Sequence, residues 1–321
     1  MEFFLINLCN GLSYGLLLFM LSAGLTLTFS FLGVLNFAHA SFYMLGAYLG
    51  YSLTQTFGFA WGIVFAPLLT ATLGILVERF ALRHVHAQGQ LAELLFTFGL
   101  SYLILECVQL IWGRVALPYR IPESLQASLF TIYDSPFTWF RGLIVALALG
   151  ILLSMLIVIR RTQLGLIMQA ALGQPQMLAA LGYDVPTIFM WVFGFGCGLA
   201  GLAGTLGGCL MVTEPNMASS LGSIAFVLIV MGGIGTLKGV FFASLCIGIF
   251  QTFAVTVDAS LLDLVQHIST NRETQAPSRI LLIRVADVAP MLPILLLLLI
   301  LLWRPHGFYR QSHSTQRTIY F

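Results

Sequence analysis

The sequence has few charges. Only 8% of its 321 residues are Asp, Glu, Lys or Arg and 59% are hydrophobic, whereas about 25% of an ordinary soluble domain is charged. No soluble fold could hide so much apolar surface from water, so the composition excludes a soluble protein and predicts an integral membrane protein. The net charge of +2 is also too small for a nucleic-acid-binding protein, which carries a basic stripe along one face.

Paired cysteines and the common catalytic or metal-binding motifs are lacking as well. The five cysteines lie singly inside apolar runs, which gives neither a disulfide framework nor a metal-ligand spacing: Cys9, Cys107, Cys197, Cys209 and Cys246. There is no His-Glu-x-x-His and no Gly-x-Ser-x-Gly. The sequence therefore predicts no metal site and no enzyme. The first residues, Met1-Glu2-Phe3, carry no positive region, so we expect a first membrane helix rather than a cleaved signal peptide.

Long apolar runs are abundant. A helix needs about 20 apolar residues to span a bilayer, and runs of this kind occupy 11–32, 36–56, 59–77, 92–112, 138–159, 187–210, 221–236, 239–257 and 282–303. Only three residues separate the first two runs, so either both cross or one is broken and re-entrant. No run alternates like a strand of a membrane barrel. We predict an all-α polytopic transmembrane helical bundle, a single domain over residues 1–321, with eight to nine spanning segments, some of them broken.

The charges that are present separate into two groups. One set of loops is basic: Arg79, Arg83, Arg160, Arg161, Lys238, Arg304, Arg310 and Arg317. The other set is acidic: Glu123, Asp134, Glu214, Asp258, Asp263, Glu273 and Asp287. Positive loops stay in the cytoplasm, so the pattern predicts that loop 160–186 and the C-terminal tail are cytoplasmic and that loop 258–281 is extracytoplasmic. His84 and His86 belong to a basic loop, and we expect them to be solvated.

Two glycine patterns stand out. Small residues recur every four positions on one helix face, which lets neighbouring helices approach closely in lipid: Gly196, Ala200, Gly204 and Gly208. A second pattern, GGIGTLKG at residues 232–239, is not a phosphate-binding loop, because no Ser or Thr follows Lys238 and no strand precedes it. It reads as a break between two apolar segments. Broken helices often line transport pathways, so Gly232, Gly233 and Gly235 are candidate pathway residues.

Loop 160–186 is long, poor in charge and rich in alanine. Such an amphipathic segment fits a short helix that docks into a groove on another protein, or equally a helix that lies on the lipid surface. The candidate docking residues are Thr162, Gly165, Gln169, Ala170, Gln174, Ala180 and Gly182.

Asn36 and His39 are polar residues in a stretch that has no formal charge from residue 3 to residue 77. Polar side chains are costly in an oily interior unless they find partners. We expect them to cap or bridge a break between the first two segments, beside the pathway; support of the structure and contact with a substrate both stay open. Glu93 and Glu106 lie near the two ends of one segment rather than at its middle, which argues against an ion-coupled carrier.

The stretch GLTLTFSFLGVLNFAHASFYMLGAYLG, residues 24–50, resembles the N-terminal signature of the LivH-type permeases, the branched-chain amino acid permeases of bacterial ABC importers. Loop 160–186, GLAGLAG (198–204) and MGGIGTLKG (231–239) resemble further segments of that family in the same order, so the resemblance covers residues 10–255. One departure is Ala40, where the family has glycine. Another is the docking loop, which lacks the family's additional arginines and acidic pair.

The resemblance implies a permease subunit in the bacterial inner membrane that does no chemistry itself and holds no cofactor. Its partners would be a second permease subunit, two cytoplasmic ATPase subunits that bind the ATP, and a periplasmic substrate-binding protein. Loop 160–186 would be the site at which the ATPases dock. Branched-chain amino acids are the expected substrate, with urea, short amides or sugars as alternatives. A standalone channel or secondary carrier is the competing class.

Overall fold

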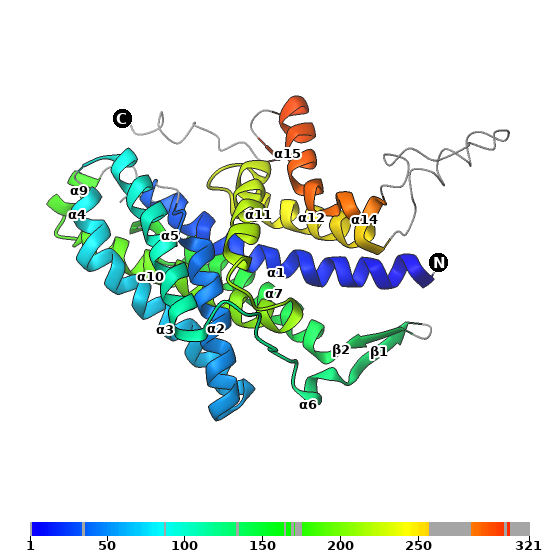
Figure 1. Cartoon of the computed structure of the whole chain (residues 1–321). Coiled ribbons are helices and arrows are strands. Elements are labelled where there is room, and N and C mark those ends of the chain that lie inside the picture. The colour runs from blue at the N-terminus through cyan, green and yellow to red at the C-terminus, as the bar shows by residue number, and fades with distance from the viewer. Residues whose placement is uncertain are drawn as a thin grey trace, which may run out of the picture.

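The computed structural model describes residues 2–33, 36–86, 88–132, 135–163, 165–167, 170, 175–256, 284–304 and 307–308. Its long helices are α1 (Glu2–Leu32), α2 (His39–Phe57), α3 (Phe59–Val77), α5 (Gln90–Trp112), α7 (Trp139–Arg161), α10 (Val185–Leu210), α11 (Met217–Gly232), α12 (Leu237–Thr256) and α15 (Leu292–Trp303). Shorter elements are the π-helix η1 (Glu78–Leu82), α4 (Arg83–His86), α6 (Glu123–Gln126), α9 (Pro175–Ala180), α14 (Val285–Val288) and the 3-10 helix η2 (Ala289–Met291). The predicted all-α polytopic bundle is confirmed (Figure 1).

Eight of the nine predicted apolar runs each correspond to one helix, and the described part of the ninth, 282–303, forms α14, η2 and α15 in succession; the helices differ in how well they suit a bilayer. Within the described ranges, seven helical stretches are long and apolar enough to cross a membrane. The two remaining predicted runs form α11, which has 16 residues, and α2, which carries polar side chains along its length. The chain ends α1 at Leu32 and starts α2 at His39. The two runs at the N-terminus are therefore separate helices.

Helix α1 lies between α10 and α12, and its glycines allow the close approach (Figure 1). A side chain at Gly15 would come within 3.0 Å of the α12 backbone at Ser244 and Leu245. Farther along, the rings of Phe19 and Phe241 meet edge to face, with their centroids 5.2 Å apart. Because the residue numbers rise along α1 as they fall along α12, the two helices are antiparallel.

Helices α1 and α2 pack on α10 through the small residues singled out in the sequence. Gly204 faces the Tyr43 carbonyl of α2, so closely that a Cβ atom on Gly204 would overlap it. Gly196 faces Gly24 and Thr28 of α1. All four small residues of the repeat are buried: Gly196, Ala200, Gly204 and Gly208. The helix backbones therefore approach closely along this face, the geometry that small residues permit in lipid.

A two-stranded hairpin precedes α7, which the prediction of an entirely helical chain did not include. Strands β1 (Ser128–Ile132) and β2 (Ser135–Thr138) pair antiparallel, and the rings of Phe130 and Phe137 stack with centroids 4.9 Å apart. The strands project beyond the start of α7 (Figure 1). Five and four residues are too few to produce the alternating pattern by which a membrane strand is recognised in a sequence.

The loops predicted to be cytoplasmic gather at one end of the bundle. Ile167 packs against Leu178 and Val185, which joins the end of α7 to α9 and the start of α10. The ring of Phe189 on α10 lies against His86 of α4. Loops 78–90 and 160–186 are therefore neighbours.

The turn between α11 and α12 belongs to the same end. The Ser30 hydroxyl of α1 donates to the Gly235 carbonyl, and the Phe308 N–H donates to the Met231 carbonyl at 2.9 Å. The described basic residues at this end are Arg79, Arg83, Arg160, Arg161, Lys238 and Arg304. Arg310, Arg317 and the loop 258–281 lie outside the described residues. That this end faces the cytoplasm stays a prediction.

Candidate functional site

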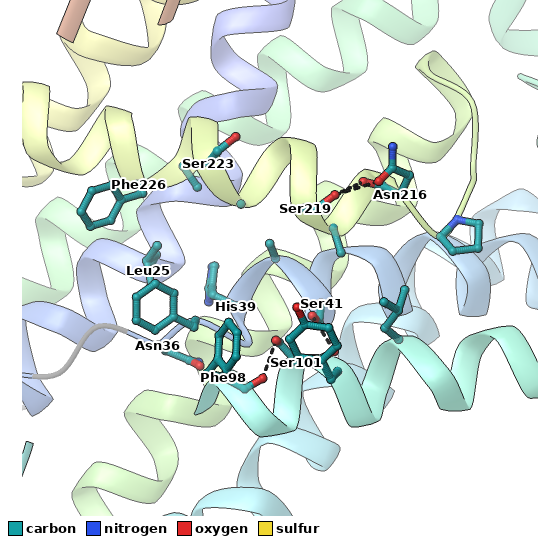
Figure 2. A pocket seen from close by; sticks show the side chains of 18 of the residues that line it. Leu25, Asn36, His39, Ser41, Phe98, Ser101, Asn216, Ser219, Ser223 and Phe226 are labelled. Carbon is teal, nitrogen blue, oxygen red and sulfur yellow. Dashed lines mark hydrogen bonds between the residues drawn. The ribbon is translucent and has the colours of Figure 1, made fainter. Parts of the chain in front are cut away.

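A groove of about 770 Å³ runs along one flank of the bundle, between α11 on one side and α2 and α5 on the other (Figure 2). Leu25 of α1 closes part of its floor. The remaining lining residues come from the α1–α2 turn, α2, α5, α11 and two loops: Asn36, Phe37, His39, Ala40, Ser41, Phe98, Ser101, Tyr102, Leu105, Gln109, Arg114, Glu214, Pro215, Asn216, Ala218, Ser219, Gly222, Ser223, Ala225 and Phe226. Hydroxyl, amide, imidazole and charged side chains are thus distributed along a groove whose lining is mostly apolar.

Asn36 and His39 lie at the end of the groove beside the α1–α2 turn. The Asn36 side-chain oxygen accepts the Ala38 N–H at 3.0 Å, which caps the start of α2. His39 Nε2 lies 3.0 Å from the Leu21 carbonyl of α1. A carbonyl can only accept, so this nitrogen carries the proton and Nδ1 is left as an acceptor. The pair thus bridges the break between the two helices.

Both residues also keep an unused polar atom. Asn36 Nδ2 and His39 Nδ1 are buried and have no hydrogen-bond partner among the described residues. Since buried polar groups are normally paired, one unused donor and one unused acceptor beside a groove suit a polar ligand. Structural support and ligand contact are therefore compatible roles for these two side chains.

The facing walls of the groove are single faces of α5 and α11. Phe98, Ser101, Tyr102, Leu105 and Gln109 follow one another at three- and four-residue spacing on α5, so they share a face. A hydrogen bond at 3.3 Å from the Ser41 hydroxyl to the Ser101 carbonyl ties α2 to this wall.

Across the groove, Ser219, Gly222, Ser223 and Phe226 form the corresponding face of α11 (Figure 2). These residues were not predicted from the sequence, because isolated serines in apolar helices are common. The four-residue spacing of Ser219 and Ser223 was the one available signal.

The glycine turn between α11 and α12 lies apart from this groove. Gly233 and Gly235 have positive φ angles of 99° and 79°, a conformation that other residues rarely adopt. The Thr236 hydroxyl lies 3.1 Å from the Gly232 carbonyl and 2.8 Å from that of Gly233. None of these three glycines lines the described groove. They form the helix break, and any link to the pathway runs through α11 itself.

Loop 160–186 combines a buried anchor with an exposed apolar surface. Gly165 is buried, and a Cβ atom there would overlap the Ile159 and Val158 carbonyls at the end of α7. The Thr162 hydroxyl donates to the Val158 carbonyl at 2.7 Å. Thr162 and Gly165 therefore fasten the loop to α7 and offer little surface to a partner.

Several other described residues of the loop are exposed. Ala170 and Ala180 are exposed, and Gly182, with φ of 91°, ends α9. Large apolar side chains nearby are also exposed: Leu166, Met177, Leu181 and Tyr183. Gln169 and Gln174 lie outside the described residues. The exposed apolar side chains are the part of the predicted docking surface that is available for contact.

Asp184 stabilises the start of α10 beside this surface. Its carboxylate accepts from the Thr187 hydroxyl and from the Thr187 N–H at 3.4 Å. The bond from the Thr187 side chain holds the pKa of Asp184 below its usual range, although desolvation acts in the opposite direction. Because the folded pKa is depressed, this cap is present at neutral pH and is lost as the pH falls through the carboxyl range.

The expectation that His86 is solvated is wrong. His86 Nδ1 contacts Glu93 Oε1, and His86 Nε2 lies 3.9 Å from Glu78 Oε1. Glu78 and Glu93 are only 1% and 4% exposed. The π-helix turn of η1 and the first turn of α5 bring the two carboxylates to the same imidazole, which no spacing in the sequence indicates. His84, in contrast, is exposed.

Replacing His86 with alanine is expected to destabilise the protein. The substitution removes the hydrogen-bond partner of Glu93 Oε1 and the imidazole that lies 3.9 Å from Glu78 Oε1, and an unsatisfied buried group costs about 1–3 kcal/mol. Thermal unfolding of the detergent-purified protein should show a lower midpoint than wild type. His84→Ala, which removes an exposed imidazole from the same short helix, is the control. Equal midpoints for the two variants would contradict a bracing role for His86.

The rim at the other end of the groove is built by two segments from distant parts of the sequence. The Leu117 N–H donates to the Thr213 carbonyl at 2.8 Å, which lays the segment after α5 beside the segment before α11. The buried Thr213 hydroxyl donates to the Gly208 carbonyl at 3.1 Å. Tyr119 is anchored by its hydroxyl, 3.0 Å from that of Thr54. These contacts fix Arg114 and Glu214 on the rim.

Comparison with known proteins agrees with this architecture. Residues 7–301 match the model of the family described as "Branched-chain amino acid transport system / permease component". The permease protein LivH of the high-affinity branched-chain amino acid transport system of Salmonella typhimurium is 26% identical over 265 residues, which cover 78% of this chain and 86% of LivH. BraD of Pseudomonas aeruginosa is 26% identical over 268 residues, which cover 79% of this chain and 87% of BraD. A probable LivH permease of Methanocaldococcus jannaschii is 25% identical over 247 residues, 74% and 77% of the two chains. No solved structure matches the chain.

The family match spans nearly all of the described helices and includes both walls of the groove. Together with the seven apolar helices, it makes the chain a multi-pass protein of the inner membrane. The predicted resemblance is thereby confirmed. The chain belongs to the family of permease components of branched-chain amino acid transport systems.

Proposed function

We propose that this chain is the translocation subunit of an ABC importer and that the groove is its half of the substrate pathway. The observation that carries the proposal is the groove between α11 and the α2–α5 wall, whose mostly apolar lining carries polar side chains along its length. It runs from Asn36 and His39 at the end with the basic loops to Asn216 at the opposite rim (Figure 2). A permease needs polar side chains along its pathway, because burying a polar solute in an apolar bundle without hydrogen-bond partners is costly.

A second permease subunit is the partner that the groove suits. Ser219, Ser223 and Phe226 of α11 and Phe98 and Tyr102 of α5 line the groove and are exposed or half-exposed at its open side. A facing subunit with a similar wall would close the groove into a pathway between the two chains. The periplasmic binding protein would deliver substrate to the rim, and two ATPases, which bind the ATP, would act on loop 160–186. This chain itself would perform no chemistry.

Branched-chain amino acids fit the mixed lining of the groove. Leu25, Leu105 and Phe226 offer apolar contact for an aliphatic side chain, whereas Ser101 and Ser223 offer hydroxyls to the polar groups of the solute. A sugar or urea would use the hydroxyls but would gain little from the apolar side chains. The composition of the groove thus favours an amino acid with an aliphatic side chain.

Replacing Ser223 with tryptophan tests the proposed pathway. The indole would project into the groove and should reduce uptake of radiolabelled leucine, isoleucine and valine at least tenfold, roughly the effect of a barrier increase of about 1.4 kcal/mol. The measurement uses the native host, with the substituted chain expressed in place of wild type and its amount in the membrane quantified.

The matched control is Ser154→Trp, which adds the same side chain at an exposed position of α7 that does not line the groove. Uptake in the control should equal that of wild type. Undiminished uptake by inserted Ser223→Trp protein would remove the groove from the pathway. Uptake of urea or a sugar by the wild-type host strain, with none of the three amino acids, would replace the proposed substrate.

A further inference from the structure

We propose that Arg114 and Glu214 form a paired-charge rim that accepts the two charges of a zwitterionic amino acid as it enters the groove. This inference rests on the proposed function and deepens it, since it names the side chains that select the charge type of the substrate. In this proposal, Arg114 binds the carboxylate of the substrate and Glu214 binds its ammonium group. The family description and the names of the relatives assign neither residue.

Backbone contacts place the two residues on the same rim. Arg114 follows the end of α5 at Trp112 by two residues, and Glu214 directly follows Thr213. The hydrogen bond from Leu117 to Thr213 joins their segments, and Thr213 is itself buried against α10. Segments held in this way keep a cation and an anion on one rim at little entropic cost on binding.

Arg114 and Glu214 are the two residues with formal charge among the described residues that line the groove. The rest of the lining consists of aliphatic, aromatic, hydroxyl, amide and imidazole side chains and one proline. The formal charge of the groove is therefore zero, but it is divided between two opposite groups at one end. An anion would be repelled by Glu214 and a cation by Arg114, whereas a zwitterion can satisfy both.

The two side chains do not neutralise each other. Among the described residues, neither Arg114 nor Glu214 forms an ion pair with the other or with a third residue. A guanidinium binds a carboxylate through two parallel N–H donors, and a carboxylate accepts from an ammonium group. Both groups are thus free to bind a solute that carries the complementary pair.

Residues next to the rim add a second preference, for the side chain of the substrate. Gln109 and Asn216 lie next to the rim, and Leu105 and Ala218 follow along α5 and α11. A zwitterion held by its two charges at the rim can point its aliphatic side chain toward these apolar residues. The charge pair would then select the α-amino acid group, and the apolar stretch would favour its side chain.

Neutral substitutions test the rim in the complete importer of the native host. Arg114→Gln and Glu214→Gln should each lower leucine uptake at low substrate concentration by about tenfold, because each removes a charged hydrogen bond to the substrate. Arg120→Gln and Glu123→Gln are matched controls: both are exposed at the same end of the bundle, and neither lines the groove. The controls should transport as wild type does, at equal amounts of inserted protein.

Charge reversal separates substrate binding from contact with a partner protein. Arg114→Glu and Glu214→Arg each place two like charges on the rim and should abolish uptake. The double variant R114E/E214R restores one charge of each sign, and a small zwitterion can bind in the reversed orientation, so its uptake should exceed that of both single reversals. A partner protein with fixed charges could not reverse in this way.

The outcomes distinguish a failure of the rim proposal from a failure of the proposed function. Glutamine variants that transport like the Arg120 and Glu123 controls would overturn the rim and leave the proposed pathway intact. A double reversal no better than the single reversals would assign the two residues to contact with a partner and likewise overturn the rim. If the wild-type host strain takes up no branched-chain amino acid beyond a strain without the chain, the proposed function fails, and the rim fails with it.

Discussion

Replacing Ala180 with arginine is expected to release the partner ATPases and abolish uptake, while the protein stays folded in the membrane. Ala180 is exposed on α9, next to the large apolar side chains of Leu181 and Met177, which are 68% and 61% exposed. If this surface fills a groove on an ATPase, the guanidinium enters a desolvated contact without a partner. Such a charge costs at least a few kcal/mol, roughly a hundredfold or more in the association constant. Co-purification of the ATPase in mild detergent and uptake of leucine measure the two effects.

The structure shows which variants test docking without disturbing the fold of the chain itself. Gly165→Glu is unsuitable, because Gly165 is buried against the end of α7 and any side chain there disturbs the chain itself. His84→Arg is the better comparison, since it adds positive charge to an exposed position of α4 at the same end. If α9 lies on lipid instead, arginine at position 180 should be tolerated, because an anionic leaflet attracts it. Full co-purification and full uptake in Ala180→Arg would therefore refute docking.

Replacing Gly204 with leucine is expected to prevent stable folding. The new side chain would start inside the Tyr43 carbonyl of α2, so α2 must move away from α10. That movement also breaks the hydrogen bond at 3.1 Å from the Thr205 hydroxyl to the Gly46 carbonyl, which joins the same helices. Overpacking of a close contact costs about 1–3 kcal/mol or more. The yield of inserted protein and its thermal midpoint in detergent should both fall sharply.

Two other helical glycines provide matched controls for this substitution. Gly99 on α5 and Gly150 on α7 have nothing within 4 Å of the position that a Cβ atom would take. Gly99→Leu and Gly150→Leu should therefore insert and unfold as wild type does, although all three changes add the same apolar side chain. If Gly204→Leu were as stable as these controls, α2 and α10 would not be packed as described.

The helices could be predicted from the sequence because lipid permits few alternatives. A backbone without water must satisfy its own hydrogen bonds, so each apolar run has to become a helix. Eight of the nine predicted runs accordingly match one helix each, including α2 despite its polar side chains, and the described part of the ninth forms α14, η2 and α15. The hairpin β1–β2 could not be predicted in this way. Nearly all of it lies outside the apolar runs, where a short segment can form a helix, a strand or a loop.

The candidate site could be predicted only in part. Asn36 and His39 stood out because polar groups are rare in their segment, and the structure places both beside the groove. Ser219, Ser223 and Gln109 did not stand out, since their common location depends on how α5 and α11 face each other. The exposed His86 that we expected proved to be held between Glu78 and Glu93. The distance between two loops is set by tertiary packing, so it cannot be inferred from a single sequence.

The central position of α1 has a consequence for biosynthesis. This helix leaves the ribosome first, yet its neighbours α10 and α12 begin only at Val185 and Leu237. Until then its glycines at positions 11 and 15 and its buried polar residues Ser22 and Thr26 face lipid or the insertion machinery rather than another helix. Incompletely packed intermediates of this kind are the ones that aggregate or are degraded. Nascent chains that stall before α12 should therefore depend on membrane chaperones and be cleared rapidly, whereas chains released after α12 should resist proteolysis.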